Sequence, residues 1–380
     1  MCGIVGIRRF DGAPVEAGLL QQMLAQLRHR GPDGQGIVCE GSTGLGHVRL
    51  AILDPQGSAQ PMRSANGRAV ITFNGEVFHF DALRQSLLAR GVTLRTRGDT
   101  EALLETLRLD GPAGLAAVNG QFAFGFLDPA TGALFIGRDR LGILPLYYAE
   151  GPDFFAFASE IKALLPALGA PSLDEHAVED YLIHRSVPPP RTLFRGIRKL
   201  APGTVLHVRS DGRLREQRYW SLPAAPPAEA LAGEAALRAV EQQLERSVAA
   251  RLVADVSVGA CLSGGLDSSL ITALAQRRPG AGKVATFAAG FGDHRYDELP
   301  FARMVSEVLG TDHHEVVVAP SDFSDLWGRL SWHRDGPISE PGDIALFRLA
   351  QHARPHVKVL LSGEGSDERS EEHTSELQSQ

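Results

Sequence analysis

The first 160 residues alternate short apolar runs with turn residues, which is typical of a β-rich domain. Two stretches among them, residues 18–30 and 80–91, repeat their apolar residues at helical spacing. This mixture predicts antiparallel sheets layered with helices. The expected strands are residues 3–7, 44–54, 69–78, 121–128, 133–139 and 153–160. Within 69–78, the pair Asn74-Gly75 predicts a tight turn.

The pattern changes after residue 221. Residues 221–244 begin with a stretch rich in proline and alanine and then become periodic, as expected of a linker that leads into a helix. Beyond it, apolar runs of strand length alternate with helical stretches. The expected strands are 256–262, 284–290, 314–319 and 357–361, and the expected helices are 268–278 and 298–310. This order predicts a parallel, doubly wound α/β sheet, whose ligands bind at the carboxyl ends of the strands. We therefore expect two unlike domains.

Composition narrows the class of protein. Apolar residues make up 43% and charged residues 22% of the 380 residues, ordinary values for a soluble globular protein. The net charge of −7, without a basic cluster, gives no reason to expect a nucleic-acid or membrane partner. Cys2, Cys39 and Cys261 are far apart, which argues against a disulfide framework or a zinc site. The first ten residues do not have the charge order of a signal peptide. We expect a cytoplasmic enzyme.

Cys2 is a candidate nucleophile because it follows the initiator methionine directly. If Met1 is removed, Cys2 carries both a thiol and a free α-amine. An α-amine titrates near about 8, so it can act as the general base for the thiol. The alternative is a small residue in an apolar opening strand, and position alone favours that alternative.

A glycine-rich loop, Ser263–Ser268, joins the expected strand 256–262 to the helix that follows it. Paired glycines after a strand expose backbone N–H groups, and the start of a helix adds partial positive charge, so both favour a phosphate. The loop has no Lys-Ser or Lys-Thr ending, which excludes a Walker A loop. The alternative is a strand-to-helix turn with serine as the N-cap.

Seven motifs of the first half occur in a fixed order. They are "MCGIVGI", "LRHRGPDG", "GLGHVRLAILD", "FNGEVFHF", "RTRGDTE", "VNGQFAFGF" and "GRDRLGILPLYY". Together they resemble the class II glutamine amidotransferases, which use an N-terminal cysteine, over about residues 2–210. The resemblance implies an α+β Ntn-hydrolase sandwich with αββα layers for a domain at 2–212.

The same resemblance assigns roles to individual residues. Cys2 would attack the side-chain amide of glutamine and release ammonia. The Asn74 side chain and the Gly75 N–H would form the oxyanion hole, which must stabilise the developing negative charge. Arg49 would bind the carboxylate of glutamine, and Glu76 and Asp99 its ammonium group. Without the family pattern, Arg49 and Asp99 would each be interpreted as part of a surface ion pair.

Other polar residues of these motifs are expected to be structural. With an α-amine available no imidazole is needed, so His29 and His47 are interpreted as structural, and Arg30 and Asp33 as organisers of a turn. His313 and His314 are adjacent on an expected strand and point to opposite faces, which argues against a shared metal ion.

The second half carries a second resemblance. The loop Ser263–Ser268 is similar to the pyrophosphate loop of ATP pyrophosphatases, and further matches are "YDELPFARMVSEVLGTDHHEV", "DGPISEP" and "SGEGSDE". Both halves together resemble the glutamine-hydrolysing asparagine synthetases. The resemblance implies a linker at 213–235 and an ATP-binding α/β domain at 236–368. The implied ATP-binding residues are Leu262, Ser263, Gly264, Gly265, Asp267, Ser268, Ala289, Ser362 and Gly363. Asp267 and Asp367 would bind Mg²⁺, and Glu364 would be a general base beside the acceptor aspartate.

The function implied by this resemblance is the ATP-dependent amidation of aspartate, through β-aspartyl-AMP, with ammonia from glutamine. Its small-molecule partners are glutamine, aspartate and ATP, and a homodimer is compatible with it. One alternative keeps the architecture and changes the acceptor, as in polysaccharide or antibiotic pathways. Cys2, Arg49, Asn74 and Asp99 argue against a β-lactam synthetase, which does not hydrolyse glutamine. A second alternative is a glutaminase with a truncated nucleotide-binding half.

The last residues depart from this pattern. The family match stops at Glu368, inside a motif, and residues 369–380 read like a translated sequencing adapter. The alternative is a genuine disordered acidic tail. We expect an incomplete synthetase domain followed by a non-native tail.

Overall fold

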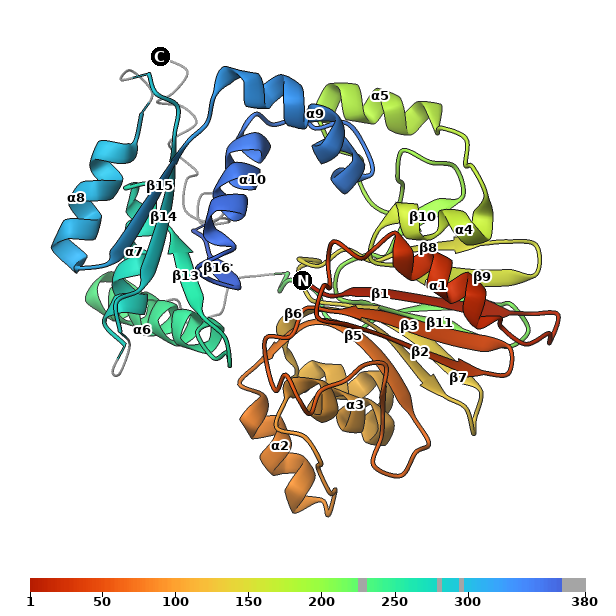
Figure 1. Cartoon of the computed structure of the whole chain (residues 1–380). Helices are drawn as coiled ribbons and strands as arrows, with labels where there is room; N and C mark the ends of the chain where they lie inside the picture. Colours follow the sequence, from red (N-terminus) through yellow and green to blue (C-terminus); the bar gives the residue numbers. More distant parts are fainter. Residues whose placement is uncertain (225–230, 279–281, 294–296, 364–380) are drawn as a thin grey trace. The chain divides into compact units, whose positions relative to one another are not determined.

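A computed structural model describes residues 1–224, 231–278, 282–293 and 297–363 (Figure 1). Its contacts divide the chain into two compact units, Met1–Pro226 and Pro227–Gln380. Each unit is described by itself below.

The first unit contains two antiparallel sheets, each of six strands within the described residues. The first sheet has the order β10-β8-β9-β1-β3-β2, with β1 (Gly3–Arg9), β2 (Gly34–Glu40), β3 (Thr43–Arg49), β8 (Tyr147–Glu150), β9 (Phe154–Ala158) and β10 (Ile197–Lys199). The second has the order β12-β11-β7-β6-β5-β4, with β4 (Met62–Arg63), β5 (Val70–Phe78), β6 (Asn119–Asp128), β7 (Ala133–Arg138), β11 (Thr204–Val208) and β12 (Leu214–Arg218).

Helices cover the outer faces of both sheets, which makes four layers (Figure 1). The first sheet packs against α1 (Ala17–Ala25), through Leu20, Met23 and Leu24. The second packs against α2 (Phe80–Ala89) and α3 (Asp99–Asp110). The remaining helical segments of the unit are η1 (Gly111–Ala117), η2 (Ile161–Ala163), α4 (Leu165–Leu168) and α5 (Glu175–His184).

The middle of the unit is a core between the two sheets. Ile4 and Phe157 of the first sheet meet Val70 and Ile136 of the second in one buried cluster. Neighbouring residues on these strands point outward, as Val5 does toward α1 and Ile71 toward α3, because side chains alternate along a strand. The αββα sandwich predicted from the sequence is confirmed.

The predicted turn at Asn74-Gly75 is wrong, because β5 runs straight through both residues. Gly75 has a φ of +148°, which favours glycine. A Cβ atom there would lie 2.2 Å from the carbonyl oxygen of Gln121 on the paired strand β6. Glycine is needed here because the backbones of β5 and β6 approach each other closely. An Asn-Gly pair therefore suits such a strand as well as a tight turn.

The strand predicted at 44–54 is shorter than expected, since β3 ends at Arg49. The backbone beyond it is engaged elsewhere. The Leu50 N–H donates to Cys2 Sγ at 3.3 Å and the Ala51 N–H donates to Asp33 Oδ2 at 2.8 Å. Leu50 and Ala51 therefore have side-chain partners in place of a strand ladder.

The second unit has a parallel sheet of order β15-β14-β13-β16 within the described residues. Its strands are β13 (Val258–Cys261), β14 (Ala285–Gly290), β15 (Asp312–Val317) and β16 (Val359–Leu361). Its helices are α6 (Gly233–Arg251), α7 (Leu266–Gln276), α8 (Leu299–Leu309), α9 (Pro320–Arg334) and α10 (Gly342–Ala353). Ala288 packs toward α8 while Phe287 packs toward α10, so helices cover both faces.

The predicted doubly wound parallel sheet is thus confirmed. The chain order reverses between β13 and β16, which are neighbours in the sheet although β14 and β15 separate them in sequence. In open α/β sheets such a reversal marks the place where ligands bind. Within the described part of the chain, no helix is long and apolar enough to cross a membrane.

Candidate active site

Cys2 lies at the start of β1, and the register of β1 against β3 determines its neighbours. Gly3 pairs with Val48, so Cys2 comes beside the residues that end β3. Besides accepting the Leu50 N–H, Cys2 Sγ donates to the Leu50 carbonyl oxygen at 3.6 Å. Arg30 donates from Nε to the Cys2 carbonyl oxygen at 2.8 Å. The candidate nucleophile is therefore held through both its sulfur and its backbone.

The protonation state of Cys2 follows from its burial. Burial raises the pKa of its thiol, against the opposing effects of the Leu50 N–H, the N-terminal ammonium, Arg49 and Arg30. A thiol of this kind needs a base to become a nucleophile. While Met1 is present the α-amine belongs to it, and burial, aided by Arg30, lowers the pKa of this amine to about 6. An amine with that pKa is largely unprotonated at pH 7 and can accept a proton.

Asn74 points toward the first sheet. Thr72, two residues earlier and on the same face of β5, donates from Oγ1 to the Gly46 carbonyl oxygen of β3 at 3.0 Å. Asn74 is 1% exposed, and neither its amide nitrogen nor its amide oxygen has a hydrogen-bond partner among the described residues. An unpaired buried amide is costly, which makes Asn74 a candidate to bind a ligand.

Charged groups surround this face. Glu76 shares it with Asn74, and its charge acts on the N-terminal amine. The positive charge of Arg49 acts on the Cys2 thiol and favours a lower pKa for it. Asp99 is the first residue of α3 and accepts the Val77 N–H at 2.9 Å, which docks its carboxylate on β5. The three charged residues predicted to recognise glutamine therefore come from three elements, Arg49 from β3, Glu76 from β5 and Asp99 from α3.

Asp99 offers a test that needs no substrate. It is 4% exposed, and burial raises its pKa from about 4 to about 6. Because the folded protein then holds this proton more tightly than the unfolded chain, stability falls as pH rises from about 4 to about 6. We expect Asp99→Asn to stabilise the ligand-free protein at pH 7.5 by on the order of 3 kcal/mol, and by much less near pH 4.

Denaturant unfolding of wild-type protein and Asp99→Asn at pH 7.5 and pH 4.5 measures this difference. Asn can still accept the Val77 N–H, so the substitution isolates the charge. A variant that is less stable than wild type at pH 7.5 would contradict the cost ascribed to the buried carboxylate. Asp153, whose side chain is half exposed and lies 3.5 Å from Arg9, is the control, since Asp153→Asn removes a carboxylate that is not fully buried and should not stabilise the protein.

The glycine-rich loop of the second unit follows β13 directly. Gly264 has a φ of +85°, and a Cβ atom there would lie 2.6 Å from the backbone of Phe301 on α8, so only glycine fits. The hydroxyls of Ser263 and Ser268 lie 2.9 Å apart and close the loop. Gly265 is the N-cap of α7, so the helix begins directly after the two glycines of the loop.

The other predicted nucleotide residues gather at the same edge of the sheet. Leu262 is 1% exposed beside β14, and Ala289 lies near the carboxyl end of that strand. Ser362 and Gly363 follow β16, and a Cβ atom on Gly363 would lie 3.1 Å from the Cβ of Asp267. The structure therefore brings both predicted loops together where the strand order reverses. Glu364 and Asp367 lie outside the described residues.

Magnesium is the metal that the sequence resemblance implies. Among the described residues, no group of three or more histidine, cysteine or carboxylate side chains could hold a metal ion. Mg²⁺ is usually held by one or two carboxylates together with nucleotide phosphates, so it does not require such a group. Asp267, in the first turn of α7, fits the part of one such carboxylate.

The histidines of the motifs have structural partners. His29 lies 3.0 Å from Glu160, measured between Nε2 and Oε1. Burial lowers the pKa of His47 to about 3, so this ring is uncharged at neutral pH. His313 contacts Thr286 whereas His314 stacks on Phe287, as expected of adjacent residues on a strand.

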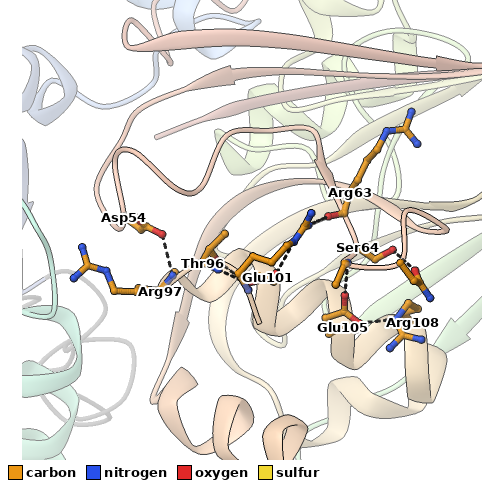
Figure 2. A network of polar contacts seen from close by, with 12 residues as sticks. Asp54, Arg63, Ser64, Thr96, Arg97, Glu101, Glu105 and Arg108 are labelled. Atoms are coloured by element: carbon orange, nitrogen blue, oxygen red, sulfur yellow. Dashed lines mark hydrogen bonds and ion pairs between the residues drawn. The ribbon is translucent and has the colours of Figure 1, made fainter. Parts of the chain in front are cut away.

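Sequence reasoning missed a polar network that holds the loops around the site (Figure 2). Glu101 is fully buried and accepts hydrogen bonds from the N–H groups of Arg95 and Thr96. Asp54 accepts the N–H of Arg97 at 2.9 Å. Both acids belong to motifs that were recognised for other residues. Their role depends on contacts between loops that are far apart in sequence, which a motif does not reveal.

Comparison with known proteins identifies the family. A model of the glutamine amidotransferase domain matches residues 1–220, and a model of asparagine synthase matches residues 239–370. The protein named putative asparagine synthetase (glutamine-hydrolyzing) 2 of Methanocaldococcus jannaschii is 33% identical over 391 residues, covering 97% of this chain and 75% of the relative. The chain belongs to the glutamine-hydrolysing asparagine synthetase family.

Other members of the family are longer. Asparagine synthetase (glutamine-hydrolyzing) 1 of Bacillus subtilis is 34% identical over 374 residues, and a putative asparagine synthetase of Mycobacterium tuberculosis is 37% identical over 391 residues. Each match covers 97% of this chain but only 58% and 60% of the relative. This chain thus spans about three-fifths of the length of these asparagine synthetases.

Among solved structures, a glutamine phosphoribosylpyrophosphate amidotransferase from B. subtilis is similar, with a TM-score of 0.45 and 17% identity. The similarity covers 83% of the present chain and 81% of the amidotransferase chain.

Proposed function

We propose that the first unit hydrolyses glutamine at Cys2. The observation that carries this proposal is the buried, unpaired amide of Asn74 on the strand face that looks toward the sheet of Cys2. The donors of an oxyanion hole must have no other partner, so that they can stabilise the negative charge that develops on the substrate oxygen during the reaction. The Asn74 amide and the Gly75 N–H are proposed as these donors.

The reaction needs a base, a nucleophile and an oxyanion hole. The α-amine, which belongs to Cys2 once Met1 is removed, takes the thiol proton, and the sulfur attacks the amide carbon of glutamine. The tetrahedral oxyanion is stabilised by Asn74 and Gly75. On collapse the ammonium returns its proton to the leaving nitrogen, which departs as ammonia and leaves a thioester. Water then hydrolyses the thioester to glutamate and restores the thiol.

Glutamine itself is recognised by its two charges. Arg49 binds the α-carboxylate, while Glu76 and Asp99 bind the α-ammonium. The raised pKa of Asp99, about 6, supports this role, because a bound ammonium would favour the ionised carboxylate. Glutamine affinity should therefore increase as pH rises through about 6.

We propose that the second unit activates a carboxylate with ATP, in agreement with its family. The nucleotide would lie at the strand-order reversal, with its phosphates on the N–H groups of the Ser263–Ser268 loop and of the start of α7. Asp267 would hold Mg²⁺, which neutralises the phosphates when bound. Leu262 and Ala289 would border the adenosine, and Ser362 and Gly363 would contact the nucleotide from the neighbouring loop.

The proposed acceptor is aspartate. Its side-chain carboxylate attacks the α-phosphorus of ATP and displaces pyrophosphate, which gives β-aspartyl-AMP. Ammonia then attacks the acyl carbon and displaces AMP, which gives asparagine. Glu364 as general base and Asp367 as second metal ligand stay predictions, as do a cytoplasmic location and a homodimer.

One isotope experiment tests the whole proposal. Glutamine labelled with ¹⁵N in its side-chain amide is incubated with the protein, aspartate and Mg–ATP, and the products are measured by mass spectrometry. We expect ¹⁵N-asparagine and AMP in equal amounts. Asp267→Asn is expected to lower AMP formation at least about tenfold and to leave glutamate formation in place. If AMP formed only when another carboxylic acid was added in place of aspartate, the proposed acceptor would be wrong. If glutamate formed without AMP, this chain would act as a glutaminase only.

A further inference from the structure

The guanidinium of Arg49 is oriented by the loop that follows its own strand. It donates to the carbonyl oxygens of Pro55, Asp54 and Leu53, at 2.6 Å, 2.9 Å and 3.4 Å. These bonds engage at most three of the five N–H donors of a guanidinium, so donors remain for a substrate carboxylate. The position of Arg49 therefore depends on the backbone conformation at residues 53–55.

Asp54 fixes that backbone and at the same time binds a distant segment. Its Oδ2 atom accepts the N–H of Arg97 at 2.9 Å, and its Oδ1 atom accepts the N–H of Gly57 at 3.1 Å. Asp54 is 7% exposed and has a φ of +43°, a conformation that costs energy for a residue with a side chain. The N–H of Arg97 is the main reason that the pKa of Asp54 is lowered, so the side chain is a carboxylate at neutral pH.

The segment that Asp54 binds ends at Asp99. Gly98 packs directly against the loop of Asp54, since a Cβ atom on Gly98 would lie 2.4 Å from Ser58 Oγ and 3.6 Å from Asp54 Cβ. Glu101 holds the other end of the segment through the N–H groups at 95 and 96 (Figure 2). Asp99 follows immediately and docks on β5.

We propose that Asp54 is a positioning residue that couples two of the charged residues that recognise glutamine, Arg49 and Asp99. Its backbone carbonyl orients Arg49, and its carboxylate holds the segment that delivers Asp99. This inference rests on the proposed glutaminase function. An α-amino acid presents its carboxylate and its ammonium on one carbon atom, so a site that binds both needs its cation and its anion at one fixed spacing. Asp54 supplies both the backbone carbonyl that orients Arg49 and the carboxylate that holds the segment leading to Asp99.

The coupling predicts a specific kinetic defect. Asparagine has one acceptor oxygen where aspartate has two, so in Asp54→Asn either the N–H of Arg97 or the N–H of Gly57 loses its partner. The spacing between Arg49 and Asp99 then becomes variable. Cys2, Asn74 and Gly75 are held by other contacts, so the chemical step should continue once glutamine is bound. We expect Asp54→Asn to raise the KM for glutamine by about 10- to 100-fold and to change kcat by less than about threefold. Asparagine tolerates a positive φ, so this change removes the charge without adding backbone strain.

A substrate analogue separates positioning from general damage. Glutaramate is glutamine without its amino group, so it makes no use of Asp99. The wild-type protein should prefer glutamine to glutaramate in kcat/KM, and Asp54→Asn should lose at least about tenfold of that preference. A structural defect that lowers the amount of active protein would reduce both rates equally and leave the preference unchanged.

The matched control is Asp128, which caps the turn between β6 and β7 by accepting the N–H groups of Ala130 and Thr131. Asp128→Asn removes the same kind of cap at a distance from the site and should leave both KM and the substrate preference as in the wild type. Should Asp54→Asn fail to fold, Gly57→Ala gives the same test. A Cβ atom at Gly57 would lie 2.3 Å from Asp54 Oδ2 and displace the carboxylate.

The outcomes separate two failures. Wild-type protein that hydrolyses glutamine, together with an Asp54→Asn variant of unchanged KM and unchanged preference, overturns the positioning role alone. A fall in kcat at unchanged KM overturns it too. Wild-type protein that releases no ammonia from glutamine overturns the proposed function, and this inference with it.

Discussion

Replacing Cys2 with alanine removes glutamine hydrolysis, with an expected loss of at least about 10⁴-fold in kcat. The loss follows from the absence of any other nucleophile in the proposed reaction, since the thioester cannot form. Ammonia or glutamate release, followed by a coupled assay, measures it. The fold should be retained, because the hydrogen bonds of the Cys2 thiol with the described residues are two weak ones, both with the backbone of Leu50.

Cys39 provides the control for this substitution, since it is an exposed free cysteine in the same unit. Cys39→Ala should hydrolyse glutamine at the wild-type rate. If Cys2→Ala retained the wild-type rate, the glutaminase proposal would be wrong, and so would every role assigned to Asn74, Gly75 and Arg49.

Replacing Asn74 with alanine separates catalysis from stability. The loss of one oxyanion donor should lower kcat by about 10²- to 10³-fold. The amide has no partner among the described residues, so its removal sacrifices no hydrogen bond of the folded protein. We therefore expect the free energy of unfolding to change by less than about 1 kcal/mol, measured by denaturant unfolding beside the kinetics.

Thr72 on the same strand face is the contrasting control. Its hydroxyl donates to Gly46, so Thr72→Val should lower the free energy of unfolding by about 1 kcal/mol and leave kcat within a few-fold. An Asn74→Ala variant with a large loss of stability and an unchanged kcat would show that the amide supports the fold and not the reaction.

Much of the architecture could be predicted from sequence because periodicity is local. Hydrophobic periodicity along the chain predicted two unlike domains, one of antiparallel sheets layered with helices and one with a parallel sheet, and both fold classes were confirmed. Asn74-Gly75 failed as a turn because the same two residues also suit a strand that another backbone approaches closely. Gly264 was recognised as part of a loop, although only its contact with Phe301 explains why a side chain is excluded.

The parts of the site that were missed depend on long-range register. Cys2 meets Leu50 only because Gly3 pairs with Val48, a fact that no short motif contains. Asp54 binds Arg97 across 43 residues of sequence, between two loops without periodicity. The reversal of strand order beside β13 could likewise be predicted only if the pairing of β16 with β13 were already known.

The central claim is that Cys2, freed of Met1, is the residue that attacks glutamine. The most direct measurement uses a glutamine analogue whose amide is replaced by a diazoketone, followed by mass spectrometry of the peptides. We predict a single adduct, on a peptide that begins at Cys2, and protection by excess glutamine. An adduct on Cys39 or Cys261, or labelled protein that retains Met1, would contradict the claim.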